Sequence, residues 1–190
     1  GVIVQLPVLP ADLTERAIEA LAADKDVDGL SSNAKFDPAT PTAILWLLAG
    51  YNITLERVAI VGHGRLVGAP LEKMLRSSGV DVVSYDETSA DELPNKLPDA
   101  RVIITATGQP GLITSDMVAH NAVVVDAGTA SEGGVIRGDV AADVRARQDL
   151  TITPERGGVG PLTVAALFDN VLLAARRAGF PSKARTAAAN

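Results

Sequence analysis

Four short runs of mostly apolar, often β-branched residues are what most constrain the fold of this chain. They lie at 58–61, 80–85, 101–105 and 122–126, and helix-forming or loop segments separate them. Uninterrupted apolar runs of this length are typical of parallel strands that helices cover on both faces. Strands that alternate with helices in this way are joined by right-handed crossovers. The sequence therefore predicts an α/β fold built on a parallel sheet.

Composition agrees with this core and narrows the class of protein. Of the 190 residues, 47% are hydrophobic but only 3% are aromatic, so aliphatic side chains must form the core. A net charge of −6 disfavours a nucleic-acid partner. The chain has no cysteine, which fits a cytoplasmic protein. We find no apolar run of the ~18 residues that a membrane span needs, and the two histidines have no metal-site pattern.

Further elements are predicted from spacing and from proline and glycine. Apolar residues recur at helical spacing in four segments, and two short helices are expected at 90–97 and 115–120. The apolar run 1–6 predicts a buried strand, and Pro38 and Pro41 predict a loop that ends before the second helix. The four helical segments are 13–23, 43–49, 70–78 and 163–178.

A glycine-rich loop at 62–68 directly follows the first of the apolar runs and precedes a predicted helix. Gly62 permits a tight turn, Gly64 lets the backbone approach a pyrophosphate, and Gly68 lets the helix pack closely on the sheet. The spacing is one residue longer than G-x-G-x-x-G, so a plain strand–turn–helix connection remains open. The other loop residues expected at a dinucleotide are His63, Arg65 and Val67.

The ends of the later strands add to this Rossmann-like pattern. Asp86 follows the second strand, where a carboxylate accepts hydrogen bonds from an adenosine ribose and repels a 2′-phosphate. Glu87 adds to the repulsion, so NAD is favoured over NADP, unless both acids are only solvated loop residues. Ligands of open parallel sheets bind outside the carboxyl ends of the strands. The remaining candidate cofactor-binding residues at these ends are Thr107, Gly108, Asp126 and Gly128.

Eight segments, in order along the chain, resemble one protein family. They include the glycine-rich loop IVGHGRLVGAP at 60–70 and the TPERGGVGPLTVAAL segment at 153–167. With them the chain resembles the tetrahydrofolate dehydrogenase/cyclohydrolase family, the FolD-type bifunctional enzymes. The other segments are GVIVQLP at 1–7, KDVDG at 25–29, PATP at 38–41, TATGQPGLI at 105–113, VVDAG at 124–128 and GDV at 138–140.

The resemblance implies an enzyme of one-carbon metabolism. Such an enzyme oxidises 5,10-methylenetetrahydrofolate with NADP or NAD and hydrolyses the methenyl product to 10-formyltetrahydrofolate. It also implies a homodimer and a C-terminal helix that packs back on a folate-binding α/β domain, of which this chain would carry a remnant. We expect that remnant at 1–50, the Rossmann domain at 51–155, and the GGVGP loop, returning helix and tail at 156–190.

By the same resemblance, Gln5 and Asp28 match catalytic and substrate-binding residues of the folate pocket. Asp28 is the second acid of KDVDG and matches the aspartate that contacts the pterin ring. Apart from the resemblance, Gln5 would be read as a polar residue at a strand end and Asp28 as a turn residue. The loop that lines the same pocket is matched by Gly158, Gly160 and Pro161.

The chain also departs from the family pattern. The catalytic lysine of the family lies in a Tyr-x-x-x-Lys motif upstream of VQLP, where this sequence begins, and neither Lys25 nor Lys35 replaces it by spacing. A fragment or a natural short homologue without hydrolase activity would explain this. His63 and Gly64 replace the family's Arg-Ser, which again favours NAD. Two other readings stay open: a nucleotide-binding homologue without folate chemistry, and another Rossmann dehydrogenase.

Overall fold

The structure is a computed structural model that describes residues 1–179 apart from 7, 9, 11 and 133–134. The chain divides into two compact units. Unit 1 consists of Gly1–Ala39 and Ala165–Asn190, and unit 2 of Thr40–Val164. The domain limits expected from the sequence differ from the limits of these units, and they stay a prediction.

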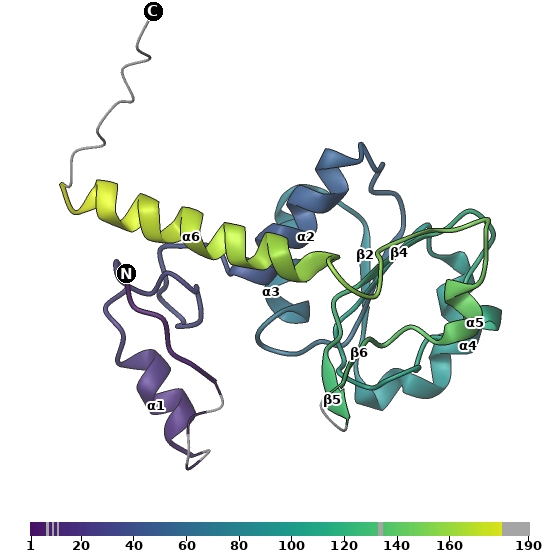
Figure 1. Cartoon of the computed structure of the whole chain (residues 1–190), viewed down its shortest axis with the longest axis horizontal. Coiled ribbons are helices and arrows are strands. Elements are labelled where there is room, and N and C mark those ends of the chain that lie inside the picture. The colour runs from purple at the N-terminus through teal and green to yellow at the C-terminus, as the bar shows by residue number, and fades with distance from the viewer. Residues whose placement is uncertain (7, 9, 11, 133–134, 180–190) are drawn as a thin grey trace, which may run out of the picture. The chain divides into compact units, whose positions relative to one another are not determined.

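Unit 2 is built on a five-stranded parallel sheet in the order β2-β1-β3-β4-β7. Figure 1 labels β2 and β4 of this sheet. The chain moves from β1 outward to β2 and then crosses to β3 on the other side of β1. This reversal places a topological switch point between the carboxyl ends of β1 and β3, where open α/β sheets bind their ligands. The strands are β1 (Val58–Val61), β2 (Val82–Tyr85), β3 (Val102–Thr105), β4 (Val123–Asp126) and β7 (Thr151–Ile152).

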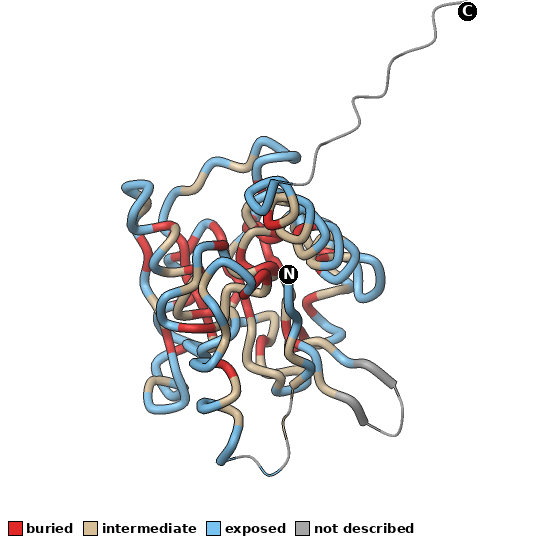
Figure 2. Tube along the Cα trace, turned by 90° about the vertical axis from the view of Figure 1, so that its left-hand side faces the viewer, coloured by how far each residue is buried: buried red, intermediate tan, exposed pale blue. Residues whose placement is uncertain are grey.

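Both faces of this sheet are covered, which explains the continuous apolar runs. Val58 and Ile60 belong to one core cluster, whereas Ala59 and Val61 belong to the other. Helix α2 (Ala39–Gly50), helix α3 (Gly68–Ser77) and the start of α6 (Val159–Arg177) contribute to the first cluster. Helices α4 (Leu93–Lys96) and α5 (Ala142–Arg145) contribute to the second. Figure 2 marks these buried positions in red.

The remaining elements of unit 2 are short. A two-stranded antiparallel ribbon of β5 and β6 follows the fourth strand of the sheet. The predicted helix at 115–120 is only a single 3₁₀ turn. These elements are η1 (Glu87–Glu92), η2 (Leu97–Asp99), η3 (Ser115–Met117), β5 (Ala130–Glu132) and β6 (Val135–Arg137).

Three helices begin earlier than the sequence predicts, and each has a proline in its first turn. Helix α2 begins at Ala39 and contains Pro41, α3 begins at Gly68 and contains Pro70, and α6 begins at Val159 and contains Pro161. A proline in the first turn removes an N–H that has no helical partner in any case. Our expectation that Pro41 lies in a loop before the helix is therefore wrong.

Unit 1 contains helix α1 (Leu13–Glu19) and most of α6 around a small core. Val27 and Phe36 are buried there against Ala174 of α6. The side-chain amide of Asn170 donates to the carbonyls of Val27 and Asp37, both at 2.9 Å. The C-terminal helix thus packs on the N-terminal segment, as the resemblance implied.

The predicted strand at 1–6 is not observed. This segment forms only one isolated bridge, between Val2 and Asp26, and Val2 and Ile3 are 40% and 52% exposed. A strand needs a neighbouring strand to complete its hydrogen bonds. Among the described residues of unit 1, the segment 1–6 pairs only with the turn that contains Asp26. Its apolar sequence predicted burial, but these residues contain no neighbouring strand that would cover it.

Among the described helices, α6 alone is long and apolar enough to cross a membrane by length and composition. Asp169 and Asn170 interrupt the apolar residues of this helix, so the sequence contains no uninterrupted apolar run of that length. One such helix is weak evidence for a membrane span, and the Asn170 hydrogen bonds attach its middle to the N-terminal segment of unit 1.

Candidate cofactor and substrate site

The glycine-rich loop joins β1 to α3 at the switch point of the sheet. Gly62 has φ +99°, and a Cβ there would lie 2.5 Å from the Ala106 carbonyl oxygen. A Cβ on Gly68 would lie 1.8 Å from the Gly62 oxygen, whereas one on Gly64 would meet nothing within 4 Å. Gly62 and Gly68 are therefore needed to build the turn, and Gly64 leaves open space beside the backbone.

This open space belongs to a cavity of about 370 Å³ at the carboxyl ends of β1, β2 and β3. The glycine-rich loop forms one wall, and the start of η1 and the loop after β3 form the others. We call it the nucleotide cavity. Of the predicted cofactor-binding residues, those that line it are Gly62, His63, Gly64, Asp86 and Thr107.

Asp86 both caps η1 and borders the nucleotide cavity. Its carboxylate accepts hydrogen bonds from the Thr88 hydroxyl at 2.7 Å and the Thr88 N–H at 2.9 Å. The hydroxyl of Thr88, its N–H and then Ser89 lower the pKa of this carboxyl, so it is ionised at neutral pH. A fixed negative charge therefore stands at the end of β2, where a ribose is recognised.

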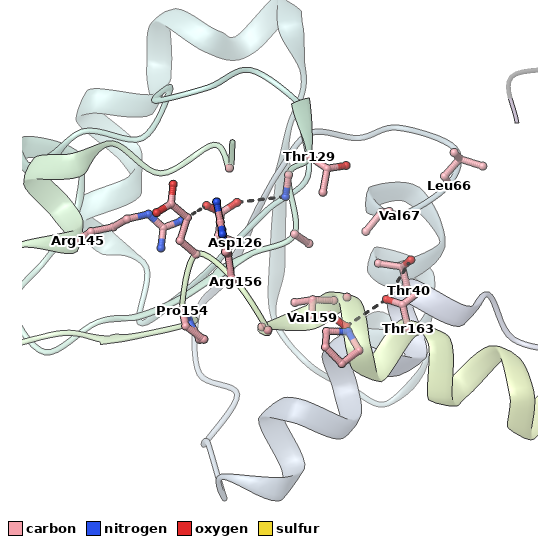
Figure 3. Close-up of a pocket in the computed structure, with 18 residues that line it drawn as sticks. Thr40, Leu66, Val67, Asp126, Thr129, Arg145, Pro154, Arg156, Val159 and Thr163 are labelled. Atoms are coloured by element: carbon pink, nitrogen blue, oxygen red, sulfur yellow. Dashed lines mark hydrogen bonds and ion pairs between the residues drawn. The ribbon is translucent and has the colours of Figure 1, made fainter. Parts of the chain in front are cut away.

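A larger cleft of about 730 Å³ opens beyond β4 and β7 (Figure 3). The GGVG segment and Pro161 form one side of it, and Leu66 and Val67 of the glycine-rich loop another. We call it the reaction cleft. The predicted site residues that line it are Val67, Asp126, Gly128, Gly158, Gly160 and Pro161.

At one wall of the reaction cleft, the carboxylate of Asp126 is occupied by hydrogen bonds and an ion pair within the protein. Its carboxylate accepts hydrogen bonds from the backbone N–H groups of Gly128 and Asp139, both at 3.1 Å, and pairs with the Arg145 guanidinium (Figure 3). The side chain of Asp126 is only 3% exposed. Such a saturated, buried carboxylate fixes the loops after β4 and before α5 rather than presenting a free charge to a ligand.

Asp139 is a site residue that the sequence reasoning missed. It is fully buried, and its Oδ2 accepts a hydrogen bond of 2.7 Å from the Thr107 N–H. A Cβ on Gly128 would lie 2.0 Å from Asp139 Oδ1. Asp139 therefore positions the strand ends that carry Thr107 and Gly128. Asp139 is the middle residue of the GDV segment at 138–140, which matches the family but by its sequence alone does not indicate a role for this aspartate.

The two acids of the KDVDG turn in unit 1 differ in their surroundings. Asp26 is fully buried and accepts hydrogen bonds from the Ser31 N–H at 2.7 Å and the Ser31 hydroxyl at 2.6 Å. Asp28 is half-buried and has no hydrogen bond to the described residues. Burial, and then the charge of Asp26, raise the pKa of its carboxyl. Asp26 therefore holds the turn, whereas Asp28 makes no such hydrogen bonds to the described residues.

The other predicted site residues are placed as follows. The exposed side chain of Gln5 donates to the adjacent Leu6 carbonyl at 3.0 Å. Gln5 and Asp28 belong to unit 1, and the other candidates belong to unit 2. Arg65 is exposed and Gly108 has φ +69°, and the described walls of the two cavities include neither.

Comparisons with known proteins agree with this geometry. Residues 38–179 match the profile of the tetrahydrofolate dehydrogenase/cyclohydrolase NAD(P)-binding domain. The bifunctional protein FolD of Staphylococcus aureus is 38% identical over 187 residues, which cover 92% of this chain and 65% of the relative. The chain thus spans about 65% of that curated relative.

Solved structures give the same result. The FolD dehydrogenase/cyclohydrolase of Campylobacter jejuni superposes with a TM-score of 0.84 at 33% identity, covering 92% of this chain and 66% of that one. The Trypanosoma brucei enzyme, solved with NADP and an inhibitor, gives 0.83 at 29% identity, covering 93% and 66%. The chain belongs to the tetrahydrofolate dehydrogenase/cyclohydrolase family, and residues 38–179 correspond to its NAD(P)-binding domain.

Proposed function

We propose that this chain binds a nicotinamide dinucleotide and oxidises 5,10-methylenetetrahydrofolate to 5,10-methenyltetrahydrofolate. The observation that carries the proposal is the glycine-rich loop, where Gly64 leaves open space beside a cavity that ends at Asp86. A dinucleotide fits these residues, because a pyrophosphate needs close approach to a backbone and a ribose needs an acceptor. Membership of the family supports the choice of folate as the substrate.

The residues of the chain have three roles in this proposal. The glycine-rich loop and the start of α3 hold the pyrophosphate, and Asp86 accepts hydrogen bonds from the adenosine ribose. The reaction cleft receives the nicotinamide, and Asp28 and Gln5 of unit 1 are the residues that we assign to folate binding. When bound, the nicotinamide accepts a hydride from the methylene carbon of the folate. The protein contributes by holding the two rings together, which supplies several kcal/mol of the barrier.

The preference for NAD over NADP is part of the proposal. The ionised carboxylate of Asp86 stands where a 2′-phosphate would be attached, and Glu87 borders the same cavity. Two negative charges at this position repel a phosphate. NAD lacks that phosphate and leaves its 2′-hydroxyl to bind Asp86.

Hydrolysis of the methenyl product is a second candidate activity, which family membership favours. It needs a positioned proton-transfer group. Formation of 10-formyltetrahydrofolate from the methenyl compound by the purified chain tests this activity. The homodimer and the cytoplasmic location remain predictions, and light scattering of the purified chain tests the first.

The decisive experiment compares Gly64→Ala with Gly50→Ala, a matched pair of glycines whose new Cβ meets nothing within 4 Å. Both variants should unfold at nearly the same temperature as the parent chain. Only Gly64→Ala should weaken NAD binding, by at least about ten-fold or ~1.4 kcal/mol. Folate-dependent reduction of NAD is then measured on the same samples.

Three outcomes separate the readings. Binding and turnover of NAD support the dehydrogenase. Binding without turnover supports a nucleotide-binding homologue that performs no folate chemistry. Unchanged NAD affinity in Gly64→Ala contradicts the assignment of the glycine-rich loop.

A further inference from the structure

A third cavity, of about 450 Å³, lies beside the nucleotide cavity. His63 and Asp86 border both cavities, so the third cavity adjoins the position that we assign to the ribose. We call it the α3–β2 cavity. Its other walls come from one side of α3, from β2 and from η1, through Glu72, Arg76, Val82, Val83, Ser84 and Ser89.

Glu72 holds the two side chains of this cavity that can carry positive charge. One oxygen lies 2.6 Å from His63 Nε2, and the other accepts a 2.6 Å hydrogen bond from Arg76 Nε. Arg76 also donates to the Val82 carbonyl at 2.6 Å, which attaches it to β2. The side chain of Glu72 is 18% exposed, against 42% for His63 and 54% for Arg76. The carboxylate therefore lies beneath its two partners.

Glu72 keeps its charge at neutral pH. Partial burial alone would raise the pKa of its carboxyl, but Arg76, Ser84 and His63 together lower that pKa. The buried Ser84 hydroxyl lies near enough to contribute to this effect, although it has no hydrogen bond of normal geometry in the described part of the chain. The cavity thus contains a permanent anion and a buried hydroxyl that can still donate.

A 2′-phosphate on an adenosine ribose requires a cation at this position, commonly an arginine. The α3–β2 cavity has an arginine and a histidine in place, but Glu72 compensates them and Asp86 adds a further negative charge. We propose that Glu72 is a specificity-determining residue for the dinucleotide: it sequesters Arg76 and His63 and so disables a latent 2′-phosphate subsite. This inference rests on the proposed function.

An alternative role for Glu72 is to stabilise α3. An i,i+4 ion pair contributes little to the stability of a helix, so this role predicts a small effect on unfolding and none on the choice of cofactor. The specificity role predicts the reverse. The ratio of the NADP and NAD dissociation constants therefore distinguishes the two.

The experiment measures the dissociation constants of NADP and NAD for the full chain by titration calorimetry. We expect Glu72→Gln to shift their ratio toward NADP by at least ten-fold. Adding Arg76→Gln to that variant should remove most of the shift, because the released guanidinium is what binds the phosphate. Asp81→Asn removes one negative charge from the turn before β2, outside the α3–β2 cavity, and controls for net charge.

Each result has a defined meaning. If the parent chain binds neither NAD nor NADP, the proposed function fails. If the parent chain binds NAD but Glu72→Gln leaves the ratio unchanged, or Asp81→Asn shifts it equally, the further inference alone is overturned. A variant that loses NAD affinity is replaced by Glu72→Ala, and loss of NAD affinity in both shows that Glu72 is a structural anchor, which also overturns it.

Discussion

Acidic residues serve different purposes at the β4 end and at the β2 end of the same sheet. At the β4 end, Asp126 and Asp139 are buried and bind backbone N–H groups of the loops around them. At the β2 end, Asp86 is exposed, and Glu72 binds the side chains of His63 and Arg76. Buried carboxylates therefore shape the loops, whereas the carboxylates nearer the surface decide which charges a ligand meets. Substitutions at the first end should alter stability, and those at the second should alter the choice of ligand.

The largest effect should come from Asp126→Ala. The change leaves Arg145 without its partner in a buried site and three backbone N–H groups, of Gly128, Asp139 and Val140, without an acceptor. Breaking a buried ion pair on one side costs about 3–5 kcal/mol. Urea unfolding of the purified variant measures this loss of unfolding free energy.

The matched control is Asp91→Ala, on the exposed part of η1, which should stay within about 0.5 kcal/mol of the parent chain. Equal losses in both variants would show that Asp126 has no special structural role.

Asp26→Ala should have the next largest effect and extends the comparison to unit 1. Asp26 is buried and accepts two hydrogen bonds from Ser31. Hydrogen bonds to a charged group are worth about 1.5–3 kcal/mol, so the unfolding free energy should fall by an amount in this range. Urea unfolding provides the measurement. A variant as stable as the parent would mean that the KDVDG turn does not depend on this carboxylate.

Gly128→Ala tests the close packing at the β4 end. The added Cβ would lie 2.0 Å from Asp139 Oδ1, which is buried and cannot move into solvent. Overpacking of this kind costs about 1–3 kcal/mol. The melting temperature should fall, whereas Gly50→Ala, with open space around its Cβ, should leave it nearly unchanged. A normal melting temperature for Gly128→Ala would place Asp139 away from Gly128.

The smallest effect, and the one of opposite sign, is expected for Asp28→Asn. Because the pKa of this carboxyl is raised in the folded state, folding becomes less favourable as the pH rises from the ordinary value of 3.8 through the raised one. At pH 7 the ionised Asp28 carboxylate destabilises the folded state. Asparagine carries no charge, so the variant should melt at a higher temperature, by on the order of 2 °C. Its folate binding should weaken.

Melting curves at pH 7 and at pH 3 check this prediction, since the gain should vanish where both chains are uncharged at this position. A variant that melts lower than the parent chain at pH 7 would show that the Asp28 carboxylate stabilises the turn.

Local patterns predicted most of unit 2, because β1 is apolar throughout and β3 and β4 are apolar up to their last residue. They failed where the partner lies elsewhere in the chain. The segment 1–6 has the composition of a strand but no neighbour to pair with among the described residues. Asp139 and Asp126 are 13 residues apart, and their mutual packing cannot be seen from composition. Glu72 looks like any acid on the solvent side of a helix until His63 is placed against it.

The position of Glu72 on α3, outside the glycine-rich loop, has an evolutionary consequence. In the proposed assignment, Gly62 and Gly64 bind the dinucleotide from the loop, whereas Glu72 selects between dinucleotides from the second turn of α3. A substitution in that helical turn would then change the preferred cofactor and leave the backbone that holds the pyrophosphate intact. Cofactor choice and cofactor binding would in that case evolve independently.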